Sequence, residues 1–342
     1  MTSLNLVRRL MWLFTLLALP TIGYAQEAAI TGTVTDSTGA VLPGVTVTAV
    51  LEATGNTFVA VTDARGVYRI AGRVGVYRLT AELPGFRAVT REGLQLLVGQ
   101  VMTVNLPMLE ATAAETITVT AESPLLAIST SNLGGNVDPR QVQELPVNGR
   151  NWMALALLAP GSRTSSTAAT APLPDRNGGE AREFQLNLDG QQISSELGAG
   201  NQPRFSQDSI AEFQFISNRF DATQGRSTGV QVNAITKSGS NRLSGLFRTN
   251  FRDSKFNAKD PSLSPPRIVP IQNQQYSVAL GGPIVTDKLH YFGNFEYERN
   301  PLTSIWNTPY PAFNIELTGK TTRKLGGVRL DYQLSPQTRV MG

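Results

Sequence analysis

The sequence predicts a mainly β protein made of an N-terminal β-sandwich, a mixed αβ domain and the first strands of an incomplete transmembrane β-barrel. Three observations support this fold class. Short alternating runs separated by turn residues fill positions 28–109, strands combined with one helical run fill positions 123–241, and longer alternating strands with aromatic residues fill positions 242–342. The 342-residue chain is 41% hydrophobic and 16% charged, which argues against wholesale disorder.

The first 25 residues have the pattern of an export signal. Arg8 and Arg9 precede an apolar run at positions 10–19, and Gly23 and Ala25 supply the small residues that a signal peptidase reads. About ten apolar residues are too few for a membrane-spanning helix, which needs roughly 20. We therefore expect residues 1–25 to be a signal peptide, cleaved after Ala25, and the mature chain to cross the inner membrane.

Composition excludes several classes of site and partner. Without cysteine, the chain has no lipoprotein anchor, disulfide scaffold or thiolate metal site. The one histidine, His290, cannot complete a zinc-peptidase ligand set, and no Gly-x-Ser-x-Gly elbow accompanies it for a catalytic triad. The formal charge of +4 falls to +2 when Arg8 and Arg9 leave, and basic residues are scattered. We predict no enzyme activity, no metal, no cofactor and no nucleic-acid partner.

Residues 28–109 predict a small β-sandwich of about six or seven packed antiparallel strands. Turns with Asp, Asn and Gly separate the runs, because short polar residues and glycine favour tight turns. Asp36 and Asp63 stand in two of these turns, where they fit turn capping, with calcium ligation as the alternative. The predicted strands are Ile30–Thr35, Val45–Leu51, Phe58–Thr62, Val67–Ile70, Val76–Glu82 and Gln100–Leu106.

The same region resembles a known domain family. The order GTVTDSTGAVLPGVTVTA, TDARGVYRI and YRLTAELPGF is similar to the carboxypeptidase regulatory-like domain, which implies a transthyretin-like sandwich acting as an accessory folding or interaction module. One departure is visible at Ala71–Gly75, where members of this family usually have a Pro-Gly turn before the Tyr strand. The resemblance leaves the geometry of that turn open.

A polar segment at 110–122 reads as a linker with a short strand inside it. Its string ETITVTA resembles the TonB box of TonB-dependent receptors, which implies an extended segment that adds a strand to a sheet edge of TonB. The alternative is a last sandwich strand or a plain linker. The predicted box residues are Glu115, Thr116, Ile117, Thr118, Val119, Thr120 and Ala121.

Three pieces follow the linker in positions 123–241. ELPVNGRNWMALALLAPG at 144–161 predicts a loop, one helix and a stop, and Phe184–Gly190 predicts a strand and a hairpin turn. The third piece, Ser209–Asn241, predicts a strand, a glycine-rich turn, a second strand and another turn. In this order they resemble the plug domain of Oar-like TonB-dependent receptors, a mixed αβ domain that fills a barrel lumen.

The plug resemblance implies a turn at Gly225, Arg226 and Gly229 that leads to the final plug strand. The two glycines would permit tight backbone, and Arg226 would face the polar barrel wall, with a solvated turn residue as the alternative. Asn148 and Arg150 are either substrate-facing or simply part of the loop.

Positions 242–342 alternate in the manner of transmembrane barrel strands. Leu289, Tyr291, Gly293, Phe295 and Tyr297 share one face, and polar residues occupy the other, apart from Phe292. The string LGGPIVTDKLHYFGNFEYER also resembles the first barrel hairpin of this receptor family. A soluble half-buried sheet would alternate in the same way. A plugged transporter barrel has about 22 strands, so we expect a fragment that cannot close its barrel or transport by itself.

Two functional hypotheses remain at this point. The first is a TonB-dependent outer-membrane receptor or transporter for energy-coupled uptake of an unidentified ligand, with TonB as partner and the N-terminal domain in the periplasm. The alternative is a secreted or surface-attached adhesive protein of tandem β-domains. That alternative explains the signal and the sandwich, but not the box, plug string and barrel-like strands in series.

Overall fold

The computed structural model describes residues 28–110, 117–120, 133–160, 184–193, 204–217, 230–261, 266–306, 310–335 and 338–342. The predicted signal peptide lies outside the described residues, as do three of the predicted box residues and the predicted plug turn: Glu115, Thr116, Ala121, Gly225, Arg226 and Gly229. No helix among the described residues is long and apolar enough to cross a membrane.

Two sheets form the sandwich. The first has the order β4-β1-β7, with β8 also pairing β1, and the second has the order β3-β2-β5-β6-β9. Tyr68, Tyr77 and Leu79 are among its largest fully buried side chains, and the Tyr68 hydroxyl donates to the Val104 carbonyl at 2.6 Å. The strands are β1 (Ala28–Thr35), β2 (Thr46–Leu51), β3 (Thr57–Val61), β4 (Val67–Gly72), β5 (Gly75–Glu82), β6 (Val89–Leu96), β7 (Val101–Thr103), β8 (Leu106–Pro107) and β9 (Ile117–Thr120).

Two aspartates of the sandwich cap turns, as predicted. Asp36 Oδ1 accepts from the backbone N–H groups of Thr38 and Ala40 at 2.8 and 2.9 Å. Asp63 Oδ1 accepts from two backbone N–H groups of its own turn, both at 2.9 Å. These carboxylates therefore stabilise local backbone.

A third sheet, with five strands in the order β10-β13-β14-β11-β12, forms what we call the central domain. Trp152 packs edge-on against Phe213 in its core, with ring centroids 5.1 Å apart. The single helix expected after residue 144 is replaced by two 3-10 segments, and a short α-helix capped by Asp138 precedes them. Its elements are β10 (Leu133–Val137), α2 (Pro139–Glu144), η1 (Asn148–Arg150), η2 (Trp152–Leu158), β11 (Phe184–Leu188), β12 (Gln191–Gln192), η3 (Gln207–Ser209), β13 (Ile210–Ser217) and β14 (Val230–Thr236).

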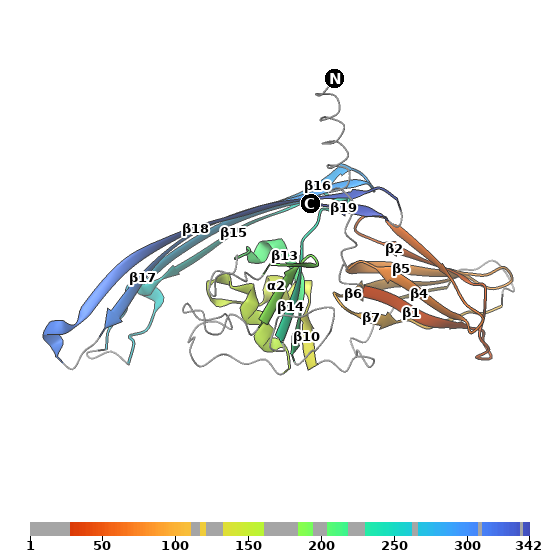
Figure 1. Ribbon diagram of the computed structural model, residues 1–342, viewed down its shortest axis with the longest axis horizontal. Coiled ribbons are helices and arrows are strands. Elements are labelled where there is room, and N and C mark those ends of the chain that lie inside the picture. The colour runs from red at the N-terminus through yellow and green to blue at the C-terminus, as the bar shows by residue number, and fades with distance from the viewer. Residues whose placement is uncertain are drawn as a thin grey trace, which may run out of the picture.

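A fourth sheet, which we call the curved sheet, is a five-stranded antiparallel meander of order β15-β16-β17-β18-β19. Two 3-10 helices accompany it, η4 (Ser254–Phe256) and η5 (Pro311–Phe313). Figure 1 shows it arching over the central domain, with the sandwich beneath one end. Its strands are β15 (Ser244–Asp253), β16 (Gln272–Val285), β17 (Leu289–Trp306), β18 (Ile315–Gln333) and β19 (Arg339–Met341).

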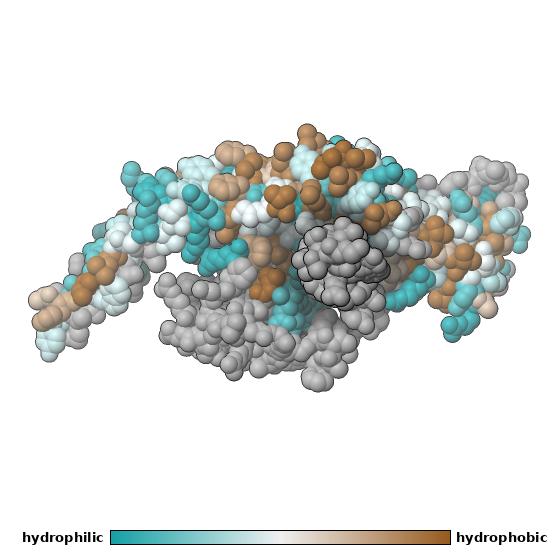
Figure 2. Space-filling model, turned by 45° about the horizontal axis from the view of Figure 1, so that its top comes forward, coloured by the Kyte–Doolittle hydropathy of each residue, from teal (hydrophilic) through white to brown (hydrophobic). Residues whose placement is uncertain are grey.

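The two faces of the curved sheet differ in polarity. Apolar side chains on the outer face are 37–77% exposed, and Figure 2 shows brown side chains gathered over this side of the molecule. The inner face is polar, and its side chains on β16 and β17 that lie over the central domain are buried. This matches the predicted alternation, with the buried Phe292 on the inner face. The exposed apolar residues include Phe247, Phe251, Tyr276, Val278, Leu280, Phe295, Val328, Leu330 and Tyr332.

The connections between curved-sheet strands are unequal. Residues 286–288 join β16 to β17, whereas β15 and β16, and likewise β17 and β18, are separated by longer stretches of sequence at the opposite end of these strands. In outer-membrane barrels the short turns face the periplasm and the long loops face outward. The sandwich meets the sheet at its short-turn end, because Asn241, whose side chain bonds the 286–288 turn, donates its backbone N–H to the Ala53 carbonyl at 2.9 Å.

Candidate functional site

The inner face of the curved sheet carries a set of buried polar side chains that meet the central domain. They are 2–6% exposed, and buried polar groups need partners to offset lost hydration. The set comprises Gln275, Ser277, His290, Glu296, Glu298 and Asp331.

A buried aspartate joins the central domain to the inner face of the curved sheet, which we call the wall. Asp208, in η3, lies 2.7 Å from the Arg150 guanidinium and 3.7 Å from that of Arg248 on β15. Burial alone would raise the pKa of Asp208, but the neighbouring Arg150 and Ser277 side chains lower it below its ordinary value. The carboxylate therefore stays charged between two guanidinium groups.

Local backbone geometry places Arg150 in this cluster. Gly149 and Arg150 both have left-handed backbone, with φ of 64° and 51°. That conformation costs a non-glycine residue about 1 kcal/mol or more, so surrounding structure must hold it. The sequence left Arg150 as either a substrate-facing residue or part of the loop. In the structure its side chain is only 8% exposed and is paired with Asp208.

Two glutamates of β17 are also tied into the wall. Ser206, next to η3, donates its hydroxyl to Glu296 Oε2, while Gln275 donates to Glu296 Oε1 at 2.6 Å. Glu298 accepts from Arg323 at 2.8 Å on the neighbouring β18. One glutamate thus binds the central domain, and the other closes a bond within the sheet.

A second group of polar contacts between the central domain and the wall lies nearer the short-turn end of the curved sheet. Arg329 of β18 reaches Asp189 Oδ1 at 3.0 Å, and also donates to the Thr236 hydroxyl at 2.6 Å and the Thr236 carbonyl at 3.0 Å. Asp189 occupies the predicted Asp-Gly hairpin turn, with φ of 49°. The guanidinium therefore bonds the ends of two central strands, β11 and β14, to the wall.

The sandwich contacts the central domain at Val98 and Gly99. The Val98 N–H donates to Glu212 Oε1 at 2.6 Å, and the Val98 carbonyl accepts from the Asn136 side chain at 3.0 Å. Gly99 follows with φ of 67°, and a Cβ there would lie 2.6 Å from the Gln214 side chain. Burial raises the pKa of Glu212 to about 7, an effect that nearby Asp138 reinforces.

The sandwich also touches the curved sheet. Arg73 donates to Gln333 Oε1 at 2.6 Å from the β4–β5 turn, the turn at which the sequence departs from its family pattern. Gly55, with φ of 71°, leaves room for Asp287, whose Oδ1 would lie 2.7 Å from an added Cβ. These contacts hold the two units together at the short-turn end.

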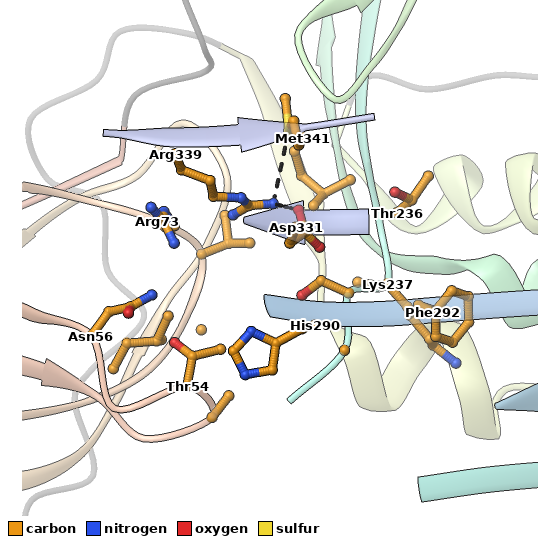
Figure 3. Close-up of a pocket in the computed structure, with 18 of the residues that line it drawn as sticks. Thr54, Asn56, Arg73, Thr236, Lys237, His290, Phe292, Asp331, Arg339 and Met341 are labelled. Carbon is orange, nitrogen blue, oxygen red and sulfur yellow. Dashed lines mark hydrogen bonds and ion pairs between the residues drawn. The ribbon is translucent and has the colours of Figure 1, made fainter. Parts of the chain in front are cut away.

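A cavity of about 580 Å³ lies where the three units meet. Figure 3 shows Asn56 and Arg73 of the sandwich facing Asp331 and Arg339 of the curved sheet, with His290 and Lys237 at the same junction. Burial lowers the pKa of Arg73 to about 10, so its guanidinium is a cation at neutral pH. No three His, Asp or Glu side chains gather as a metal site within the described residues.

The structure describes four of the predicted box residues. Ile117–Thr120 form β9, which runs parallel to β6 at the edge of the sandwich sheet. Sequence reasoning singled out neither Asp208 nor Glu212. The predicted alternation of the barrel-like strands did place Glu296, Glu298 and Arg329 on the polar face of the sheet, and this alternation was the signal available for the interface.

Two domain families match the chain. Residues 29–109 match the carboxypeptidase regulatory-like domain, and residues 235–340 match an outer membrane beta barrel domain. The chain is 27% identical over 288 residues to the TonB-dependent transporter Oar of Myxococcus xanthus, an alignment that covers 80% of this chain. It covers 27% of Oar, so this chain spans about a quarter of that relative's length.

Solved receptor structures resemble the chain weakly. The siderophore receptor PirA from Acinetobacter baumannii aligns with a TM-score of 0.36 at 16% identity, over 49% of this chain and 24% of that protein. PirA from Pseudomonas aeruginosa aligns with a TM-score of 0.33 at 17% identity, over 60% of this chain and 37% of that protein.

Proposed function

We propose that this chain, a relative of the TonB-dependent outer-membrane receptors, is part of a receptor that takes up an unidentified ligand with energy supplied through TonB. The chain lies in the outer membrane, as its barrel domain match and Oar homology indicate. In this proposal the curved sheet is barrel wall, the central domain is the plug, and the sandwich stands in the periplasm. The role is one of transport and not of catalysis.

The observation that supports this function best is the polar contact between the central domain and the curved sheet. Asp208 pairs with Arg150 and Arg248, Ser206 bonds Glu296, and Arg329 bonds Asp189 and Thr236. An interface of charges and hydroxyls can exchange its bonds for water when the plug moves, whereas an apolar interface would lose its burial. Such an interface suits a plug that is held firmly at rest and displaced under force.

The proposal assigns TonB binding to residues 115–121. The described part, Ile117–Thr120, is extended as β9, the conformation that strand addition requires. Main-chain hydrogen bonds would supply most of the affinity, which explains why an unremarkable alternating string can serve as a partner site.

A binding experiment tests this assignment. A peptide of residues 112–123 is titrated with the periplasmic domain of TonB, alongside the same peptide carrying Ile117→Pro or Ile117→Val. Proline removes a backbone donor and should abolish binding, whereas valine keeps the backbone and the β propensity and should preserve it. Absence of binding by the unmodified peptide, or equal binding by the proline peptide, would rule out the assigned site.

A further inference from the structure

The box strand in this structure already has a partner. β9 pairs with β6 in parallel register, with Val89 opposite Ile117, Thr90 opposite Thr118, Arg91 opposite Val119 and Glu92 opposite Thr120. It completes the five-stranded sheet as its last member. The backbone groups that β9 turns toward β6 are therefore not available to another sheet edge.

The edge of β6 that pairs with β9 is poorly suited to permanent pairing. The part of β6 that pairs with β9 ends with Arg91 and Glu92, and it is followed by Gly93, which has φ of 73°. A register irregularity lies between Tyr77 and Leu79, where β5 pairs with β6. Charged residues and irregular backbone are features that keep sheet edges from binding other strands tightly. The β9 ladder covers four residues, below the average strand length of about 5–6.

The sandwich that carries this edge is anchored independently of β9. Val98 is bonded by Glu212 and Asn136 of the central domain, and Arg73 is bonded by Gln333 of the curved sheet. A pull on β9 would consequently meet a fixed sheet, and the strand would separate from β6 without the sandwich following it.

We propose that the sandwich stores the box: the β6 edge holds β9 in the resting receptor, and TonB competes with β6 for the same strand. This inference rests on the proposed TonB-binding role of the box. It gives the sandwich a regulatory function, because TonB can engage only receptors whose box strand has left the β6 edge.

A disulfide lock tests the competition in the whole protein. These 342 residues contain no cysteine that could compete with a Thr90→Cys/Thr118→Cys pair, and directly opposed residues lie at a separation that a disulfide can span. The matched control is Thr90→Cys/Thr120→Cys. Thr120 is two positions out of register, and its Cα should lie roughly 8 Å away, beyond the reach of a disulfide. Both proteins are prepared in outer-membrane vesicles and captured with the TonB periplasmic domain.

The in-register pair should oxidise and the control should not. The oxidised lock should reduce TonB capture at least ten-fold, and reduction of the same sample should restore it. Undiminished capture by the locked protein would overturn the proposal, because TonB would then be adding to the free edge of β9. Equal oxidation of the two pairs, or of neither, would show that β9 does not rest on β6. Failure of the reduced and unsubstituted proteins to bind TonB would instead count against the proposed function itself.

Discussion

The interior of the sandwich and the contact between the central domain and the curved sheet are buried to similar degrees but built from opposite chemistry. Tyr77 and Leu79 in the sandwich are 0% exposed among apolar neighbours. Asp208 and Glu296 at the other contact are 1% and 4% exposed and are held by ion pairs and hydrogen bonds. Burial alone therefore does not describe what either contact does.

The difference concerns what each contact loses when it opens. Opening an apolar core exposes side chains to water at a cost of about 25 cal/mol per Å². Opening a polar contact returns its groups to hydration, so the net contribution of each hydrogen bond is only about 1 kcal/mol. Removing one member of a buried ion pair is a different matter, since the remaining charge stays buried without a partner. The polar contact should thus tolerate displacement better than it tolerates mutation.

The largest effect is expected in the sandwich core. Tyr77→Ala removes a fully buried ring that packs 6.2 Å from Phe58 and should lower the free energy of unfolding of the sandwich by about 4 kcal/mol. Hydrogen exchange of the β2 and β5 amides, measured at increasing guanidinium chloride concentration, reports this loss. Val59→Ala, at a position 60% exposed, is the control and should change stability by less than about 0.5 kcal/mol. Equal losses in the two variants would mean that the sandwich has no specific core.

The next effect concerns Asp208. Asp208→Asn leaves Arg150 and Arg248 without their shared carboxylate and should destabilise the central domain by about 3 kcal/mol. Hydrogen exchange of β13 and β14 should accelerate accordingly.

A double-mutant cycle sharpens that prediction. Arg150→Met in the Asp208→Asn background removes a buried cation that has lost its partner, so it should recover part of the loss. Simple addition of the two single losses would contradict a coupled pair. Such a result would mean that Asp208 and Arg150 contribute to stability independently, as unconnected surface residues do.

The fold class followed from the sequence because alternation and turn residues report on local backbone. The runs at Ile30–Thr35 and Val76–Glu82 correspond to β1 and β5, and the Asp-Gly turn after Phe184–Leu188 is present. β6 was missed because Arg91, Glu92 and Gly93 interrupt its apolar pattern. α2 was also missed, although Asp138 and Gln141 form a capping box around its start.

The contacts between units could not be predicted in the same way. Asp208 and Arg150 are separated by dozens of residues, and nothing in either local pattern indicates that they meet. Glu212 is one polar residue in a strand, and its environment depends on Val98, which lies 114 residues earlier. Side-chain partners set by tertiary packing leave no periodic signal in a single sequence.

The smallest effect is a pH dependence at the sandwich contact. The pKa of Glu212 is raised from 4.5 to about 7 by burial, so the folded protein holds a proton that the unfolded chain releases. The stabilisation from this proton is complete below the pKa of Glu212 in the unfolded chain. It is lost as the pH rises through the pKa of Glu212 in the folded protein. The free energy of unfolding should fall by about 2 kcal/mol between roughly pH 5.5 and pH 7.

Glu212→Gln separates this proton linkage from the hydrogen bond. Glutamine keeps an oxygen that can accept from the Val98 N–H but carries no titrating group, so unfolding of the variant should be level across the same pH range. Glu144→Gln changes an exposed carboxylate of α2 and should leave the slope of the unmodified protein intact. If the Glu212→Gln slope persisted, the carboxyl would already be charged at the contact. A charged Glu212 would then bind the sandwich to the central domain, as the charged Asp208 binds the curved sheet. The two contacts of the central domain would in that case share the same chemistry.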